Sequence, residues 1–153
     1  EDNEFSAGDN LNTPVSFAVD LKIPRFVVES PEGLALRPEK DFFSTSAQLA
    51  SLGGLEERQF DVVLGNPRRS QLKTVYHLPK GLQVKSLPKT QDMQNSFGRL
   101  HIEYRTDGEG RVIVDRTIEV TEPRVPTSSY ALFREFAAAL KRLDDARILL
   151  ERA

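Results

Sequence analysis

Residues 57–81, ERQFDVVLGNPRRSQLKTVYHLPKG, decide the fold that we expect for this chain. Apolar and polar residues alternate in each half of the stretch, which is the period of a half-buried strand. The apolar face of the first half carries Phe60, Val62 and Leu64, and that of the second half carries Leu72, Thr74, Tyr76 and Leu78. Gly65, Asn66 and Pro67 between the halves are turn-forming residues. The stretch therefore predicts a central β-hairpin.

Further strands are expected on both sides of this hairpin. Residues 15–23 alternate between two prolines, and short apolar runs lie at 26–28, 34–36 and 82–87. The clearest pair is 97–105 with 112–120, joined by a glycine-containing loop at 106–110, although Arg116 interrupts the apolar face of the second strand. This spacing predicts a mainly β fold, an antiparallel β-sandwich of about seven to eight strands.

The two remaining segments differ in pattern. Residues 38–54 have no regular period, and we expect a long excursion there with one weak strand at 47–52. The tail changes to a helical period after Pro126, with possible N-cap hydroxyls at 127–129, and predicts one C-terminal α-helix at about 128–150 packed on the sheet. We interpret residues 1–13 as a lead-in or linker and 14–153 as a single domain.

Composition limits the function classes. The 153 residues carry a net charge of −2, with 21 basic and 23 acidic side chains, so a nucleic-acid partner is not expected. No apolar run is long enough to span a bilayer, so membrane insertion is not expected either. The absence of cysteine excludes thiol nucleophiles, thiolate metal sites and disulfides within the chain. Because the chain starts at Glu1 and its one methionine is Met93, we expect it to be part of a longer polypeptide.

Side chains that could carry chemistry are scattered along the sequence. His77 and His101 would be needed for a metal site with Glu103 or for a serine triad, but neither lies at ligand spacing or near an activated serine motif, so we expect solvent-facing strand histidines. The carboxylate pairs 56–57 and 144–145 and the basic residues Arg68, Arg69 and Lys73 are also expected to be solvated. We predict no catalytic residue, no metal ligand, no cofactor-binding residue and no cofactor.

Several short motifs carry a family resemblance. They are Arg58 opening a strand, the Leu78-Pro79-Lys80-Gly81 strand end, Phe97-Gly98, and a closing set of Tyr130, Phe133, Arg134 and Phe136. In this order they resemble the C-terminal β-rich region of bacterial transglutaminase-like proteins that carry an N-terminal domain of unknown function. The segment between Arg58 and Leu64 departs from the family pattern because it lacks a proline.

The resemblance implies a sandwich-like accessory domain that follows a papain-like catalytic core. The catalytic triad of such a core needs a cysteine, so it cannot lie in this chain, and we expect the chain itself not to be an enzyme. The motif residues are then structural, and the expected partners are other domains of the same polypeptide or a protein or peptide. A bacterial cell-envelope or extracytoplasmic location is implied by the resemblance alone. The alternative function is a stand-alone adhesion or ligand-binding β-sandwich for glycans or cell-wall peptides, although the absence of tryptophan argues against stacking on sugars.

Overall fold

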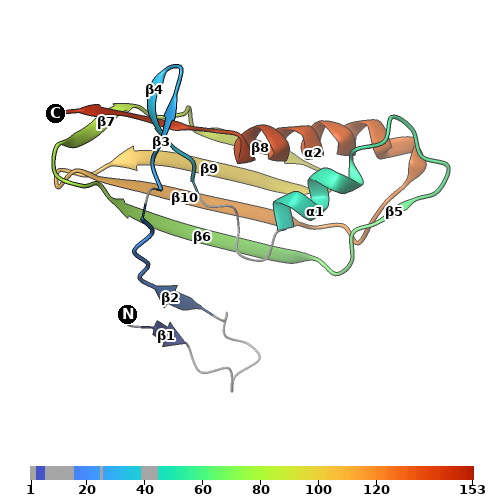
Figure 1. The fold of residues 1–153 in the computed structure, drawn as a ribbon. Helices are drawn as coiled ribbons and strands as arrows, with labels where there is room; N and C mark the ends of the chain where they lie inside the picture. The colour runs from blue at the N-terminus through green and yellow to red at the C-terminus, as the bar shows by residue number, and fades with distance from the viewer. Residues whose placement is uncertain (1–2, 6–15, 25, 39–44) are drawn as a thin grey trace.

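The computed structural model describes residues 3–5, 16–24, 26–38 and 45–153. Its first layer is a four-stranded antiparallel sheet in the order β6-β10-β9-β8, formed by β6 (Arg68–His77), β8 (Gln91–Asn95), β9 (Gly98–Thr106) and β10 (Arg111–Val120). These strands run side by side along the length of the molecule (Figure 1). One face of the sheet carries the apolar side chains, as the sequence predicts for 97–105 and 112–120.

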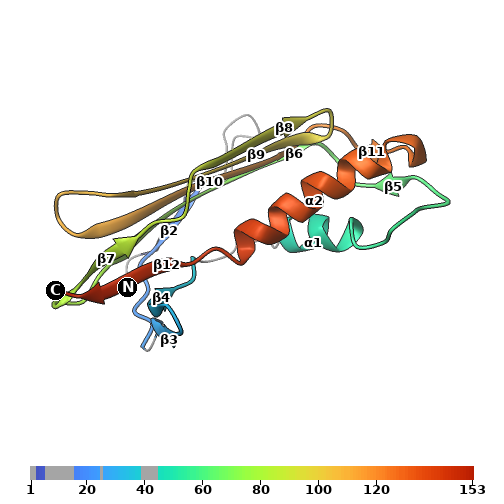
Figure 2. The same cartoon turned by 90° about the horizontal axis from the view of Figure 1, so that it is seen from above.

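The second layer is part helix and part sheet. Helix α2 (Tyr130–Asp144) covers one half of the first sheet and continues into β12 (Ile148–Arg152), which belongs to a second antiparallel sheet in the order β3-β4-β12-β7 (Figure 2). The partners of β12 are β3 (Val28–Ser30), β4 (Gly33–Leu36) and β7 (Leu82–Ser86). The mainly β, antiparallel fold class with a C-terminal helix is therefore confirmed.

Short elements complete the architecture of the described residues. Strand β5 (Val62–Val63) pairs with β11 (Arg124–Val125), the 3₁₀ turn η1 (Thr127–Ser129) precedes α2, and β1 (Asn3–Phe5) pairs with β2 (Phe17–Val19). Helix α1 (Thr45–Leu52) lies beside α2. The predicted weak strand at 47–52 is thus wrong, because Leu49 inserts into the core from a helical backbone.

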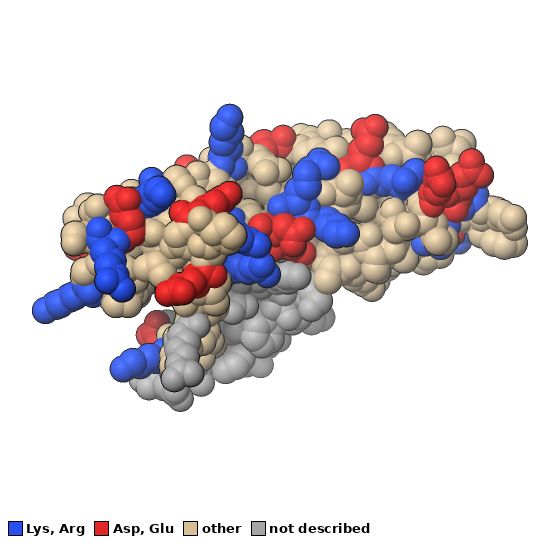
Figure 3. All heavy atoms as spheres, turned by 45° about the horizontal axis from the view of Figure 1, so that its top comes forward, with Lys and Arg blue, Asp and Glu red and all other residues tan. Residues whose placement is uncertain are grey.

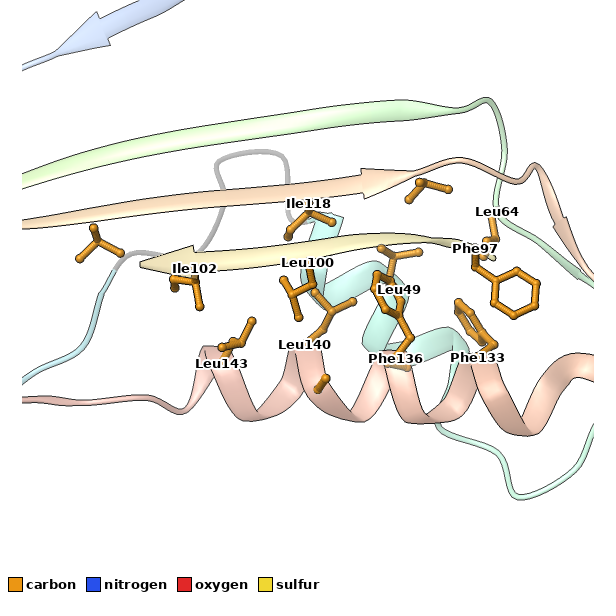
Figure 4. Close-up of a cluster of buried hydrophobic side chains, with 14 of the residues drawn as sticks. Leu49, Leu64, Phe97, Leu100, Ile102, Ile118, Phe133, Phe136, Leu140 and Leu143 are labelled. Carbon is orange, nitrogen blue, oxygen red and sulfur yellow. The ribbon is translucent and has the colours of Figure 1, made fainter. Parts of the chain in front are cut away.

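The core lies between the sheet and the helices. Phe133, Phe136, Leu140 and Leu143 of α2 point toward the sheet, where Leu140 lies near Leu100 and Leu143 lies near Ile102 of β9 (Figure 4). This spacing of three and four residues places one stripe of the helix on the sheet, and each large side chain removed from water contributes about 1.5–3 kcal/mol. All of these side chains are at most 3% exposed.

The predicted hairpin at 57–81 is wrong, although the prediction of which side chains of its second strand face inward is right. Strand β6 does not fold back on the preceding segment; it pairs along its whole length with β10, so that Thr74 lies opposite Val114. The turn at 65–67 exists and Gly65 takes a φ of 83°, but it leads from the β5–β11 ribbon into β6. Phe60, predicted to face inward, is 80% exposed.

The predicted helix at 128–150 is too long at both ends. The hydroxyl-bearing residues at 127–129 form η1, and Ser129 at the N-cap makes no side-chain capping bond. The helix ends at Asp144, after which Ile148 lies opposite Leu36 in the second sheet. Pairing with β4 and β7 on either side makes β12 a central strand, which overrides the helical spacing of its apolar residues.

The remaining strand predictions are partly right and partly wrong. The loop at 106–110 joins β9 to β10 as predicted, and the turn at 30–33 joins β3 to β4 with Gly33 at a φ of 121°. The predicted strand at 15–23 is shorter, since β2 covers only Phe17–Val19. Strand β8 was not predicted because its residues are mostly polar. The lead-in at 1–13 lies largely outside the described residues.

Candidate interaction surface

The two histidines lie on the solvent-facing side of the first sheet, as predicted. His77 is exposed at the end of β6, and His101 lies on β9 with its Nδ1 3.1 Å from Oδ2 of Asp92 on β8. Arg99 donates to the same carboxylate oxygen at 2.7 Å. This guanidinium, and secondarily His101, lowers the pKa of Asp92 against a smaller opposing effect of burial.

This carboxylate–imidazole pair lies on an open sheet face. The side chains of His101 and Asp92 are 31% and 47% exposed, and no described hollow is lined by either of them. An exposed pair is surrounded by water, which weakens its electrostatic coupling. Within the described ranges, no three carboxylate or histidine side chains lie close enough to bind a metal ion. The geometry thus places this pair among the exposed side-chain contacts of the first sheet.

The predicted solvated carboxylates and cations are confirmed with two exceptions. Asp144 is 7% exposed and pairs with Arg116 at 2.9 Å beneath the end of α2, so the prediction for that residue is wrong. Arg68 is half-buried: its Nη1 donates to the Leu64 carbonyl at 2.7 Å, and its Nη2 donates to Gln48 of α1 at 3.3 Å. Arg68 thus connects the main chain after β5 and helix α1 to the start of β6.

Shallow hollows occur on the surface of the described residues. One of about 520 Å³ lies between α1 and α2 and is lined by small residues with Arg134, Glu135 and Lys141 at its rim. Another, of about 380 Å³, lies on the second sheet between Glu29, Lys85 and Arg152. Both mix opposite charges without a converging set of polar groups, which a small-molecule site would need.

Three residues of the family motifs hold one loop in place. The Arg58 guanidinium lies 5.6 Å from the centroid of the Tyr130 ring and donates to the Leu52 carbonyl at 2.9 Å. The Tyr130 hydroxyl donates to the Leu55 carbonyl at 2.9 Å, and Arg134 donates to the Glu56 carbonyl at 3.1 Å. Together they fasten the segment after α1 to the first turns of α2.

The other motif residues lie in the core or at a turn. Phe97 and Phe133 meet edge to face at 6.0 Å between ring centroids, and Phe136 is 1% exposed. Leu78 is half-buried against the core, Pro79 accepts the turn hydrogen bond from Leu82 N at 3.2 Å, and Gly81 has a φ of 84°. Gly98 lies so close to β10 that a Cβ there would be 1.9 Å from the Glu119 carbonyl oxygen.

The fastened segment ends in exposed apolar side chains. We define the apolar tip as Leu55, Phe60, Val63 and Leu132, which are 53%, 80%, 64% and 41% exposed. They come from the loop before β5, from β5 and from the first turn of α2, elements that lie together at one end of the molecule (Figure 1). The outermost atoms at that end belong to uncharged residues (Figure 3).

The sequence pattern did not locate this tip. Alternation placed Phe60 on the buried face with Val62, but β5 extends over two residues only, so the period does not continue to Phe60. The sequence feature closest to this tip is Gly53-Gly54, which predicts a break in regular structure before it.

A family model described as "Domain of Unknown Function with solved-structure structure (DUF3858)" matches residues 38–150. The chain belongs to this family. No curated protein matches it significantly. The fold is similar to the crystal structure of a "putative protease" from Parabacteroides distasonis, with a TM-score of 0.61 and 16% sequence identity. The similarity covers 78% of this chain but 23% of that protein, so this DUF3858 chain spans about a quarter of its length.

Proposed function

We propose that this DUF3858 domain is a non-catalytic accessory domain that follows a transglutaminase-like or cysteine-protease-like core in a larger protein. Its role there is to pack against other parts of that protein or to present a partner or substrate to the core. The similarity of its fold to one quarter of a "putative protease" supports this role, as do the motif residues and the absence of cysteine. The apolar tip is the proposed contact surface.

The observation that carries the proposal is the exposure of Phe60. Its side chain is 80% exposed, whereas Phe97, Phe133 and Phe136 are at most 4% exposed. Val63, three residues along, is 64% exposed. Large apolar side chains gathered at one end of a domain are typical of a surface that another protein segment covers.

The tip is also held in shape before any contact forms. Arg58, Tyr130 and Arg134 bind the carbonyls of residues 52, 55 and 56, so the loop does not have to be ordered on association. Preorganisation of this kind lowers the entropic cost of binding. A rigid apolar surface fits packing against a fixed neighbour.

Hydrogen exchange in the full-length polypeptide tests the proposal. Amides at 55–63 should exchange more slowly in the full-length protein than in the 153-residue chain, because the neighbouring part covers them. Phe60→Ser should abolish that difference, while Val75→Ser, which removes a 39% exposed side chain on the open sheet face, should leave it intact. Equal exchange at 55–63 in both proteins would overturn the proposed surface.

Activity of the isolated chain tests the non-catalytic assignment. The purified 153-residue chain should neither hydrolyse nor cross-link peptide substrates above the buffer control. Turnover that is lost in His101→Ala would contradict the proposal. Specific retention on a glycan or peptidoglycan-fragment array, unaffected by Phe60→Ser, would instead favour a stand-alone binding domain.

A further inference from the structure

The segment before β3 has the sequence of a half-buried strand but lies exposed. Residues 15–23 alternate apolar and polar side chains, yet Val19, Leu21 and Ile23 are 44%, 70% and 47% exposed. We propose that residues 17–23 form one longer strand whose apolar side docks on the remainder of the larger polypeptide, an interface that rests on the proposed function and is separate from the apolar tip.

Within the described residues this segment is not covered from either side. Strand β2 pairs with β1 over three residue pairs, from Asn3↔Val19 to Phe5↔Phe17. Ala18, Asp20 and Lys22, on the opposite side of an extended chain, are exposed as well. A two-stranded ribbon is marginally stable by itself. The alternation therefore needs a further surface to bury its apolar side.

The segment leaves the body of the domain at a defined point. Phe26 stacks on Tyr76 of β6 with ring centroids 5.9 Å apart and an interplanar angle of 16°. Residues 26 and 27 are half-buried, whereas the described residues from 18 to 24 are all exposed. Phe26 thus anchors the chain at the sheet. From that anchor, residues 17–23 extend away from the first sheet (Figure 1).

The extent of the family match indicates which occupant covers the segment. The matched residues are 38–150, so 17–23 lie outside the DUF3858 unit that the family model describes. The similar fold forms 23% of a much longer chain. A strand that is apolar on one side and precedes the matched residues fits the surface of a neighbouring unit along the same polypeptide.

A second copy of the chain is a poorer occupant. Stable protein–protein interfaces bury about 1,200–2,000 Å² in total, and three aliphatic side chains per copy supply only a fraction of that area. An intramolecular neighbour requires less, because the covalent link keeps it at a high effective concentration. The observed exposed area therefore suits a tethered partner.

The test compares exchange at 17–23 in the full-length polypeptide and in the 153-residue chain. We expect these amides to exchange about tenfold more slowly in the full-length protein, as local opening is suppressed by the contact. Leu21→Asp should return them to the rate of the 153-residue chain. Lys22→Asp introduces the same residue on the opposite side of the strand and should leave the protection in place.

The outcomes separate this inference from the proposed function. Protection at 55–63 without protection at 17–23 overturns the inference but supports the apolar tip as a contact surface. Protection at neither segment overturns both. A second copy would instead give protection at 17–23 in the 153-residue chain itself. That protection would increase with concentration and accompany a doubled mass in light scattering, and it would overturn the tethered partner.

Discussion

Arg116 on β10 and Asp144 in the last turn of α2 form an ion pair at 2.9 Å, with side chains that are 5% and 7% exposed. Arg116 is the residue that interrupts the apolar face of its strand, and Asp144 lies 28 positions further along the chain. The pair joins the first sheet to the end of the helix that covers it.

Removing one partner should be costly. Asp144→Ala leaves the guanidinium of Arg116 buried without its counter-charge, and loss of one partner of a buried pair costs about 3–5 kcal/mol. Urea unfolding at neutral pH should show that loss in the free energy of unfolding. Asp145→Ala, one residue away at an exposed position, should change it by less than about 0.5 kcal/mol.

Replacing the whole pair separates the role of charge from that of packing. The double variant Arg116→Met with Asp144→Leu removes both charges and keeps apolar volume, so its stability should return to within about 1 kcal/mol of the wild type or exceed it. A double variant as unstable as Asp144→Ala would show that the geometry of the pair, rather than the unpaired charge, sets the cost.

Tyr104 contributes a predictable change in folding stability at alkaline pH. Its hydroxyl is buried without a hydrogen-bond partner in the described structure, and burial, partly offset by Arg116, raises its pKa to about 12. Because the folded-state pKa lies above the ordinary value, the folded protein holds this proton more tightly than the unfolded chain. Stability is retained below about pH 10 and falls as pH rises from there through about 12.

Tyr104→Phe should remove this contribution to the alkaline loss. The variant deletes an unpartnered buried hydroxyl, so at pH 7 it should be as stable as the wild type or up to about 1 kcal/mol more stable. Between pH 10 and 12 it should lose less stability than the wild type in parallel urea titrations. A loss above about 1 kcal/mol at pH 7 would mean that the hydroxyl has a partner that stabilises the fold.

The sequence predicts local structure better than pairing. The loop at 106–110 and the alternation on either side lie next to one another in the chain, so β9 and β10 follow from pattern alone. Strand β6 has an equally clear pattern, but the pattern gives only its buried face, and three strands lie between it and its partner β10 in the sequence. Ile148 and Leu150 fit a helix and a strand equally well, and the choice depends on the distant Leu36.

The candidate surface was less predictable for the same reason. Sequence reasoning singled out Arg58, Tyr130 and Arg134, but only the fold shows that all three fasten the segment bearing the apolar tip. Exposure of Phe60 depends on where β5 begins, because the pairing with β11 starts only at Val62. Alternation can identify an apolar side chain but cannot say whether anything covers it.

Gly98 should tolerate no side chain. A Cβ at this position would be 1.9 Å from the backbone oxygen of Glu119, and neither backbone can move without disturbing the β9–β10 pairing. Gly98→Ala should therefore lower the free energy of unfolding by about 2 kcal/mol or more, within the range of severe core changes. Gly108→Ala is the matched control, because a Cβ there has nothing within 4 Å and its stability should hardly change.

Gly81 differs from Gly98 because its constraint is conformational rather than steric. Nothing lies within 4 Å of a Cβ at this position, but its φ is 84°, in the turn that Leu82 N closes onto the Pro79 carbonyl. In this left-handed region an L-residue is destabilised by about 1–2 kcal/mol, and the effect is largest for β-branched residues. Gly81→Val should therefore lower the melting temperature, whereas Gly81→Asn, whose side chain tolerates this conformation, should lower it much less. Equal losses in the two variants would point to a lost contact instead of backbone strain, and an unchanged melting temperature in Gly81→Val would argue against the turn itself.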